Sequence, residues 1–124
     1  MLAFSKNVAN VYRRIDLDAR IEASSGGELT LICLEEAVAA LGQALLALER
    51  APDEVPNDAL ARAHGIAIWL VRGVAPDNPM RGALVQFYGA LASTLTRNRI
   101  RPSFDELSQV RADFADLLEA ARAG

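Results

Sequence analysis

Few residues in this 124-residue sequence have the types and spacing that metal binding requires. The chain has one histidine, His64, and one cysteine, Cys33. Di-iron helical bundles need several inward glutamates and paired Glu-x-x-His motifs, and no Glu-x-x-His occurs in this sequence. The adjacent Glu35 and Glu36 would point about 100° apart on a helix, which favours a solvated polar face. We therefore predict no metal and no cofactor.

Nucleophilic catalysis and phosphate binding have little support either. Cys33 directly precedes the predicted core position Leu34, so we expect a half-buried, unreactive thiol rather than a nucleophile paired with His64. Gly26 and Gly27 lack the lysine and the preceding strand of a phosphate-binding loop. By elimination, the sequence predicts a protein that is not an enzyme and that binds partners through helix surfaces.

Composition and charge narrow the class of partner. Apolar residues make up 52% of the chain and charged residues 23%, which is typical of one globular domain. The net charge of −3 disfavours nucleic-acid binding, and we interpret Arg97, Arg99 and Arg101 as a solvated helix end. We find no signal peptide and no apolar stretch of about 18 residues, so we expect a cytoplasmic protein without membrane insertion.

Four stretches carry apolar residues in steps of three and four, the spacing of one face of an α-helix. The first spans about residues 28–50, and the others follow breaker segments at residues 52–57, 75–79 and 102. The expected core stripes are Leu31, Leu34, Val38, Leu41, Leu45 and Leu48; Leu60, Ala63, Ala67, Leu70 and Val74; Leu84, Tyr88, Leu91 and Leu95; and Leu107, Val110, Phe114, Leu117 and Ala121.

Residues that commonly cap helices precede each stretch. Ser25-x-x-Glu28 and Ser103-x-x-Glu106 have the spacing of capping boxes; Asn57 or Asp58 could cap the second helix, and Asn78 the third, with Pro79 in its first position. Long amphipathic helices joined by short loops predict an all-α protein, an antiparallel four-helix bundle over residues 25–124. Residues 1–24 are expected to form an N-terminal arm with one short helix.

The second predicted helix is apolar on more than one side. Residues 66–71 read IAIWLV, six apolar residues in succession. After the core stripe is assigned, Ile66 falls at its flank, and Ile68 and Trp69 fall at positions that normally face water. Three interpretations remain open: the N-terminal arm covers these residues, a partner helix binds them in a groove, or they form a homodimer interface.

The order of motifs along the chain is also informative. Tyr12 lies in the arm, Ala23-Ser24 ends it, and a Leu-rich helix opens over residues 29–37. The later segments are ARAHGIAIWLVRGV (61–74), ALVQFYGALASTL (83–95) with Tyr88, and DELSQVRADFADLLEA (105–120). Over residues 10–120 this order resembles the flagellar secretion chaperones of the FliS family. The sequence departs from the family pattern at Ser25-Gly26, where the family has serine-proline, and is similar to a divergent member.

The resemblance implies a cytoplasmic chaperone that binds the C-terminal segment of newly made flagellin in apolar grooves. It would prevent premature filament assembly and deliver the subunit to the flagellar export gate, a second partner. A non-catalytic adaptor or dimerisation module with a different partner is the alternative. The expected partner-binding residues are Tyr12, Ile15, Ile66, Ile68, Trp69, Val85, Phe87 and Tyr88. The arm with Tyr12 and Ile15 is hypothesised to be a displaceable lid.

Overall fold

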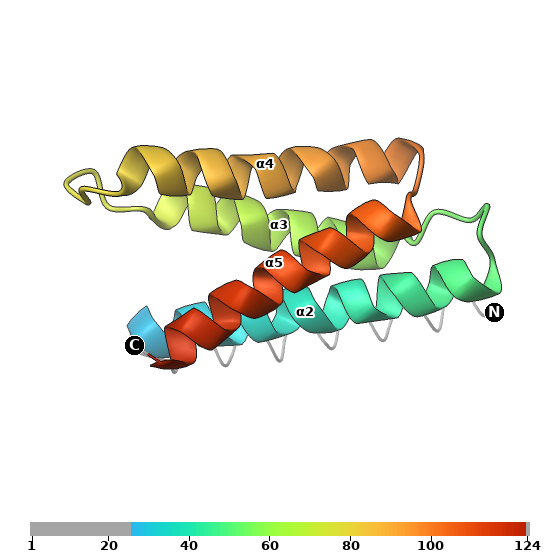
Figure 1. The fold of residues 1–124 in the computed structure, drawn as a ribbon, viewed down its shortest axis with the longest axis horizontal. Helices are drawn as coiled ribbons and strands as arrows, with labels where there is room; N and C mark the ends of the chain where they lie inside the picture. Colours follow the sequence, from blue (N-terminus) through green and yellow to red (C-terminus); the bar gives the residue numbers. More distant parts are fainter. Residues whose placement is uncertain (1–25, 124) are drawn as a thin grey trace.

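The computed structural model of the protein describes residues 26–123, which form an antiparallel bundle of four helices (Figure 1). The helices are α2 (Gly26–Arg50), α3 (Asn57–Gly73), α4 (Arg81–Ile100) and α5 (Phe104–Ala123). No strand occurs within the described residues. The prediction of an all-α four-helix bundle is confirmed. The predicted arm, with Tyr12, Ile15 and the capping residue Ser25, lies outside the described residues.

Two of the predicted helix starts are wrong by one or two residues. Helix α3 has Pro56 at its N-cap position and no side-chain capping bond, so neither Asn57 nor Asp58 is the cap. Helix α4 begins at Arg81 instead of at Pro79. The Asn78 Oδ1 accepts a hydrogen bond from the Met80 backbone N–H at 2.8 Å, so Asn78 closes a turn before the helix.

The buried face of α2 is wider than the predicted heptad stripe. Leu34, Leu41 and Leu48 are buried as expected, whereas the other three predicted leucine and valine positions are only half-buried. The other buried positions of α2 are Ile32, Cys33, Ala37, Ala40 and Ala44. Helix α2 packs closely against both α3 and α5, so small side chains on its inner face let two neighbours approach it.

Helix α2 is also long and apolar enough to cross a membrane by length and composition, because an 18-residue window within residues 27–50 has a mean hydropathy of 1.8. The prediction that no such stretch exists is therefore wrong. Within the bundle, 44% of this apolar window is buried. The core helix of a soluble bundle passes the same test, so the hydropathy of α2 is weak evidence for a membrane span.

The four helices do not pack equally. Helix α5 packs closely against α2, and α3 against α4, whereas α4 and α5 touch little. In Figure 1, α5 leaves α4 soon after the turn that joins them and crosses toward the start of α2. All buried residues of α4, which are Leu91, Ala92, Leu95 and Asn98, lie in its second half. Among the described residues, 81–90 include none that is buried, so the bundle is open along this seam.

Candidate functional site

A groove of about 240 Å³ lies along the seam between α4 and α5. Its lining residues are Phe87, Ala90, Leu91, Thr94 and Arg97 from α4, and Glu106, Gln109, Val110 and Asp113 from α5. Leu91 and Val110 are buried and provide an apolar floor, whereas Phe87 is 40% exposed. The groove is open to solvent and smaller than most small-molecule pockets, so it suits the side chains of a docked helix better than an enclosed substrate.

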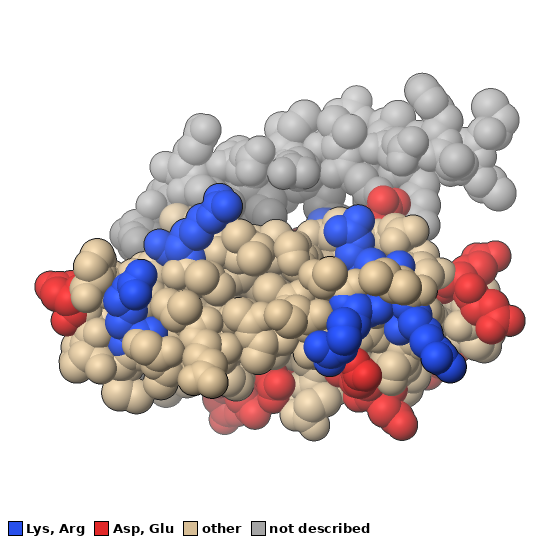
Figure 2. All heavy atoms as spheres, turned by 90° about the horizontal axis from the view of Figure 1, so that it is seen from above, with Lys and Arg blue, Asp and Glu red and all other residues tan. Residues whose placement is uncertain are grey.

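The two walls of this groove differ in charge. The sequence from Arg81 to Arg101 contains four arginines and no acidic residue, and residues 82–96 carry no charge. Figure 2, which looks onto α4, shows blue side chains gathered toward the two ends of the molecule with an uncharged stretch between them. On the opposite wall, α5 presents Glu106, Gln109 and Asp113. One wall is therefore neutral with a basic end, and the other is acidic.

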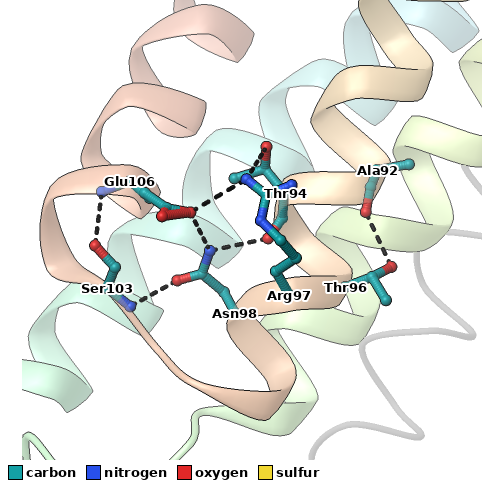
Figure 3. A network of polar contacts seen from close by, with 7 residues as sticks. All are labelled: Ala92, Thr94, Thr96, Arg97, Asn98, Ser103 and Glu106. Atoms are coloured by element: carbon teal, nitrogen blue, oxygen red, sulfur yellow. Dashed lines mark hydrogen bonds and ion pairs between the residues drawn. The ribbon is translucent and has the colours of Figure 1, made fainter.

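A buried asparagine joins the end of α4 to the start of α5 at the turn between them (Figure 3). Asn98 is 1% exposed, and its Nδ2 donates to the Thr94 backbone oxygen at 2.9 Å and to Glu106 Oε1 at 3.1 Å. The Asn98 Oδ1 accepts a hydrogen bond from the Ser103 backbone N–H at 2.6 Å. Arg97 Nη2 approaches the same Glu106 oxygen at 3.4 Å. This network fixes the end of α4 against the start of α5.

The capping box predicted at the start of α5 is half confirmed. The Glu106 backbone N–H donates to Ser103 Oγ at 3.2 Å, as a capping box requires. The Glu106 side chain does not return to the Ser103 N–H, because Asn98 takes that donor and also holds the Glu106 carboxylate. Asn98 therefore links the last turn of α4 to the cap of α5. The basic cluster Arg97, Arg99 and Arg101 is exposed, as expected of a solvated helix end.

Of the predicted partner-binding residues that the structure describes, only one lines the groove. Phe87 does so, and its ring meets the Tyr88 ring edge-on, with centroids 6.1 Å apart. Tyr88 and Val85 are half-buried, and burial raises the pKa of the Tyr88 phenol above its ordinary value. Tyr88 thus contributes to the bundle's own packing, with its hydroxyl held in the neutral form.

The additional apolar residues of α3, which are Ile66, Ile68 and Trp69, do not line the α4–α5 groove. Ile66 is 7% exposed and packs within the core, so it offers a partner almost no surface. Ile68 is half-buried against the same core. Trp69 is 36% exposed and is the only one of the three with a sizeable solvent-facing area, but it does not line the α4–α5 groove. The structure therefore separates Trp69 from Phe87 as two distinct apolar positions.

The residues considered for chemistry lie in structural roles. Cys33 is 3% exposed, more buried than expected, and its pKa is raised by burial and also by the nearby Glu36, so its thiolate is disfavoured. Glu36 Oε1 lies 3.6 Å from Arg62 Nη1, and Glu35 Oε1 lies 3.5 Å from Arg122 Nη2. Both glutamates are therefore in ion pairs rather than on a solvated face. Within residues 26–123, no group of three or more His, Cys, Asp or Glu side chains could hold a metal ion.

Sequence reasoning missed the polar residues of the groove. The sequence predicts Leu91 and Val110 as core residues but gives no role to Thr94, Gln109 or Asp113, which also line the groove. A usable signal existed, because Glu106, Gln109 and Asp113 recur in steps of three and four and so share one edge of a helix. The acid-free sequence of the preceding helix is a second such signal, because together the two patterns predict a charge difference across one seam.

No protein-family model matches the chain, and no curated protein matches it. The Cys33 thiol, whose pKa is raised by burial, lies outside this site, and the groove itself combines an apolar floor with charged edges. Such a groove can hold the apolar face of an amphipathic helix while its edges select the charge of that helix.

Proposed function

We propose that this protein is a non-catalytic cytoplasmic chaperone that holds an amphipathic helical segment in the α4–α5 groove. The observation that carries the proposal is the open seam: the first half of α4 has no buried residue, yet the groove beside it has an apolar floor and the exposed Phe87. Partly exposed aromatic residues beside an open apolar groove are typical of binding sites.

The resemblance to the FliS family supplies the proposed partner, which is the C-terminal segment of flagellin, and the export gate as a second partner. The ends of flagellin are amphipathic and bury their apolar faces only in a filament. A segment held by that same face cannot join a filament, so binding would prevent premature assembly. Part of the contact free energy would offset the entropy that the segment loses when it becomes ordered.

The dimensions of the groove are compatible with a helix of moderate length. The lining residues of α4 run from Phe87 to Arg97. At about 1.5 Å per residue, this stretch is about 15 Å long, so it would contact about three turns of a docked helix. Anchor residues at positions i, i+3 or i+4, and i+7 of the partner would then reach the floor formed by Leu91 and Val110.

Co-expression with a C-terminal flagellin fragment, followed by size-exclusion chromatography and calorimetry, tests this proposal. We expect a 1:1 complex whose affinity falls about tenfold in Phe87→Ala, which corresponds to a loss of about 1.4 kcal/mol from an aromatic anchor. Phe104→Ala is the matched control, because Phe104 is 43% exposed but does not line the groove.

Three results would contradict the proposal. The absence of a complex would exclude the flagellin segment as partner. Equal losses of affinity in Phe87→Ala and Phe104→Ala would exclude the α4–α5 groove as the binding site. A free protein that elutes as a dimer, and that Phe87→Ala converts to a monomer, would favour a dimerisation module instead.

A further inference from the structure

We infer that the α4–α5 groove selects a helix that carries basic residues along its edge facing α5 and small uncharged residues along its edge facing α4. This inference rests on the proposed function, because it specifies the chemistry and the orientation of the helix that would occupy the groove. It follows from the difference in charge between the two walls.

The α5 wall carries carboxylates that the bundle itself does not neutralise. Glu106 is already engaged by Asn98 and Arg97 at the closed end. Further along the same edge, Asp113 accepts a hydrogen bond from Gln109 Nε2 at 3.0 Å, which is a neutral donor. Asp116 lies one turn beyond Asp113, past the residues that line the groove, and is exposed. Within the described residues, neither Asp113 nor Asp116 is in an ion pair with a lysine or arginine, so an incoming cation would find both of them available.

The α4 wall, in contrast, presents no carboxylate that could pair with a basic side chain of the partner. Residues 82–96 carry no charge, and the next charged residue on this wall is Arg97. Ala83 and Ala90 are exposed and small, so the backbone of a docked helix could approach α4 closely at these positions. A lysine on the α4-facing edge of the partner would gain no carboxylate there and would be repelled by the arginines toward the turn.

The same pattern argues against two other occupants. Helix α4 from a second copy carries no lysine or arginine over residues 82–96, so it could not complement Asp113 on the groove wall or Asp116 one turn further along α5. A nucleic acid would bring phosphates toward the acidic wall, which is unfavourable. A basic-edged amphipathic helix is the occupant that satisfies both the apolar floor and the unpaired carboxylates.

Binding of two synthetic peptides to the full-length chain tests this inference. Each peptide is a helix of about 18 residues, or five turns, with the same leucine stripe and one edge of alanines. The other edge carries lysines in one peptide and glutamates in the other. Two exposed ion pairs change a binding affinity by roughly fivefold. We therefore expect the lysine peptide to bind about fivefold more tightly than the glutamate peptide. The preference should shrink at about 0.5 M salt, where screening is strong.

Charge-reversal variants locate the effect. The double variant Asp113→Lys with Asp116→Lys should reverse the preference, so that the glutamate peptide binds more tightly. The control variant, Asp53→Lys with Glu54→Lys, makes the same change in net charge in the exposed loop between α2 and α3 and should leave the preference unchanged. Phe87→Ala should weaken both peptides, because both use the apolar floor.

The outcomes distinguish this inference from the proposed function. Equal affinities of the two peptides, or the same loss of preference in both double variants, would overturn the charge selection while leaving helix docking in the groove intact. If neither peptide bound at all, helix docking in this groove would be wrong, and the charge selection with it.

Discussion

The two ends of the α4–α5 seam contrast sharply. Near the turn, Leu95 and Asn98 are almost fully buried, and a hydrogen-bond network joins α4 to the cap of α5. At the other end, residues 81–90 of α4 include no buried residue, and Phe87 is 40% exposed. The pair α4 and α5 can therefore stabilise the fold at one end and leave a surface free for binding at the other.

Contacts between α5 and α2 explain why the seam opens. Arg111 Nε donates to the Val38 backbone oxygen at 3.3 Å, and Arg122 pairs with Glu35 at 3.5 Å. Gly42 contributes to this, because a Cβ there would lie only 3.4 Å from Arg111 Nε. These contacts hold the outer half of α5 on α2, so it diverges from α4 once the Asn98 network ends (Figure 1).

The largest expected effect is on the free energy of unfolding, to which the two ends of the α4–α5 seam should contribute unequally. Leu95→Ala should lower the free energy of unfolding by about 3 kcal/mol, because it leaves a cavity in a closed core. Phe87→Ala should lower it by about 1 kcal/mol or less, because the ring is largely on the surface. Urea denaturation measures both values. Equal losses would show that the open end contributes to the fold as much as the closed end does.

The next effect tests whether the polar network holds the closed end together. Asn98→Ala should cost about 2 kcal/mol, because it removes three hydrogen bonds and leaves the Ser103 N–H without its acceptor. Asn57→Ala is the control, since Asn57 is exposed at the start of α3, where no side chain caps the helix. A loss in Asn98→Ala no larger than the control's would mean that the network does not fix the turn.

A smaller effect compares the two exposed aromatic positions in partner binding. Phe87→Ala should weaken capture of a flagellin C-terminal fragment by about 1.4 kcal/mol, the equivalent of tenfold, whereas Trp69→Ala should leave it nearly unchanged because Trp69 lies outside the groove. Calorimetric titration of the two variants gives the comparison. A comparable loss in Trp69→Ala would extend the binding surface onto α3.

The smallest effect is on the pKa of Tyr88, a half-buried residue at the open end of the seam. Burial raises the pKa of its phenol above the ordinary value of 10.0, so the native state favours the neutral form. As the pH rises past 10.0, the unfolded state ionises first, and stability is lost. Ultraviolet titration of tyrosinate in a Tyr12→Phe background, which leaves Tyr88 as the single tyrosine, measures the shift. An unshifted pKa would mean that solvent reaches this ring freely.

Sequence reasoning predicted the helices well and their boundaries less well. The heptad spacing identified Leu34, Leu41 and Leu48 as core positions, because a 3.6-residue repeat places them on one face whatever the partner helix. The start of α4 was placed too early, because Asn78 can close a turn as readily as it can cap a helix. Local propensity does not distinguish these two uses of the same side chain.

Phe87 is the one lining residue of the candidate site that the sequence marked as a partner-binding residue. Phe87 was singled out because it lies beside the predicted core stripe of its helix, and it does line the groove. Ile66 was singled out by the same argument but is buried, because the flank of α3 faces its own bundle there. The spacing of apolar residues indicates that a second face of a helix must be buried, but it does not indicate which neighbouring helix or partner buries that face.

The sequence by itself determined an all-α bundle, the core positions shared by any packing of its helices and the charge difference between residues 81–101 and α5. These follow from periodicity and residue type, which act locally. Only the tertiary structure decided that α5 packs on α2 rather than along all of α4, that Asn98 closes one end of the seam, and that Phe87 lies at an open groove. The reason is that helix crossing depends on side chains from three helices at once, which no single stretch of sequence contains.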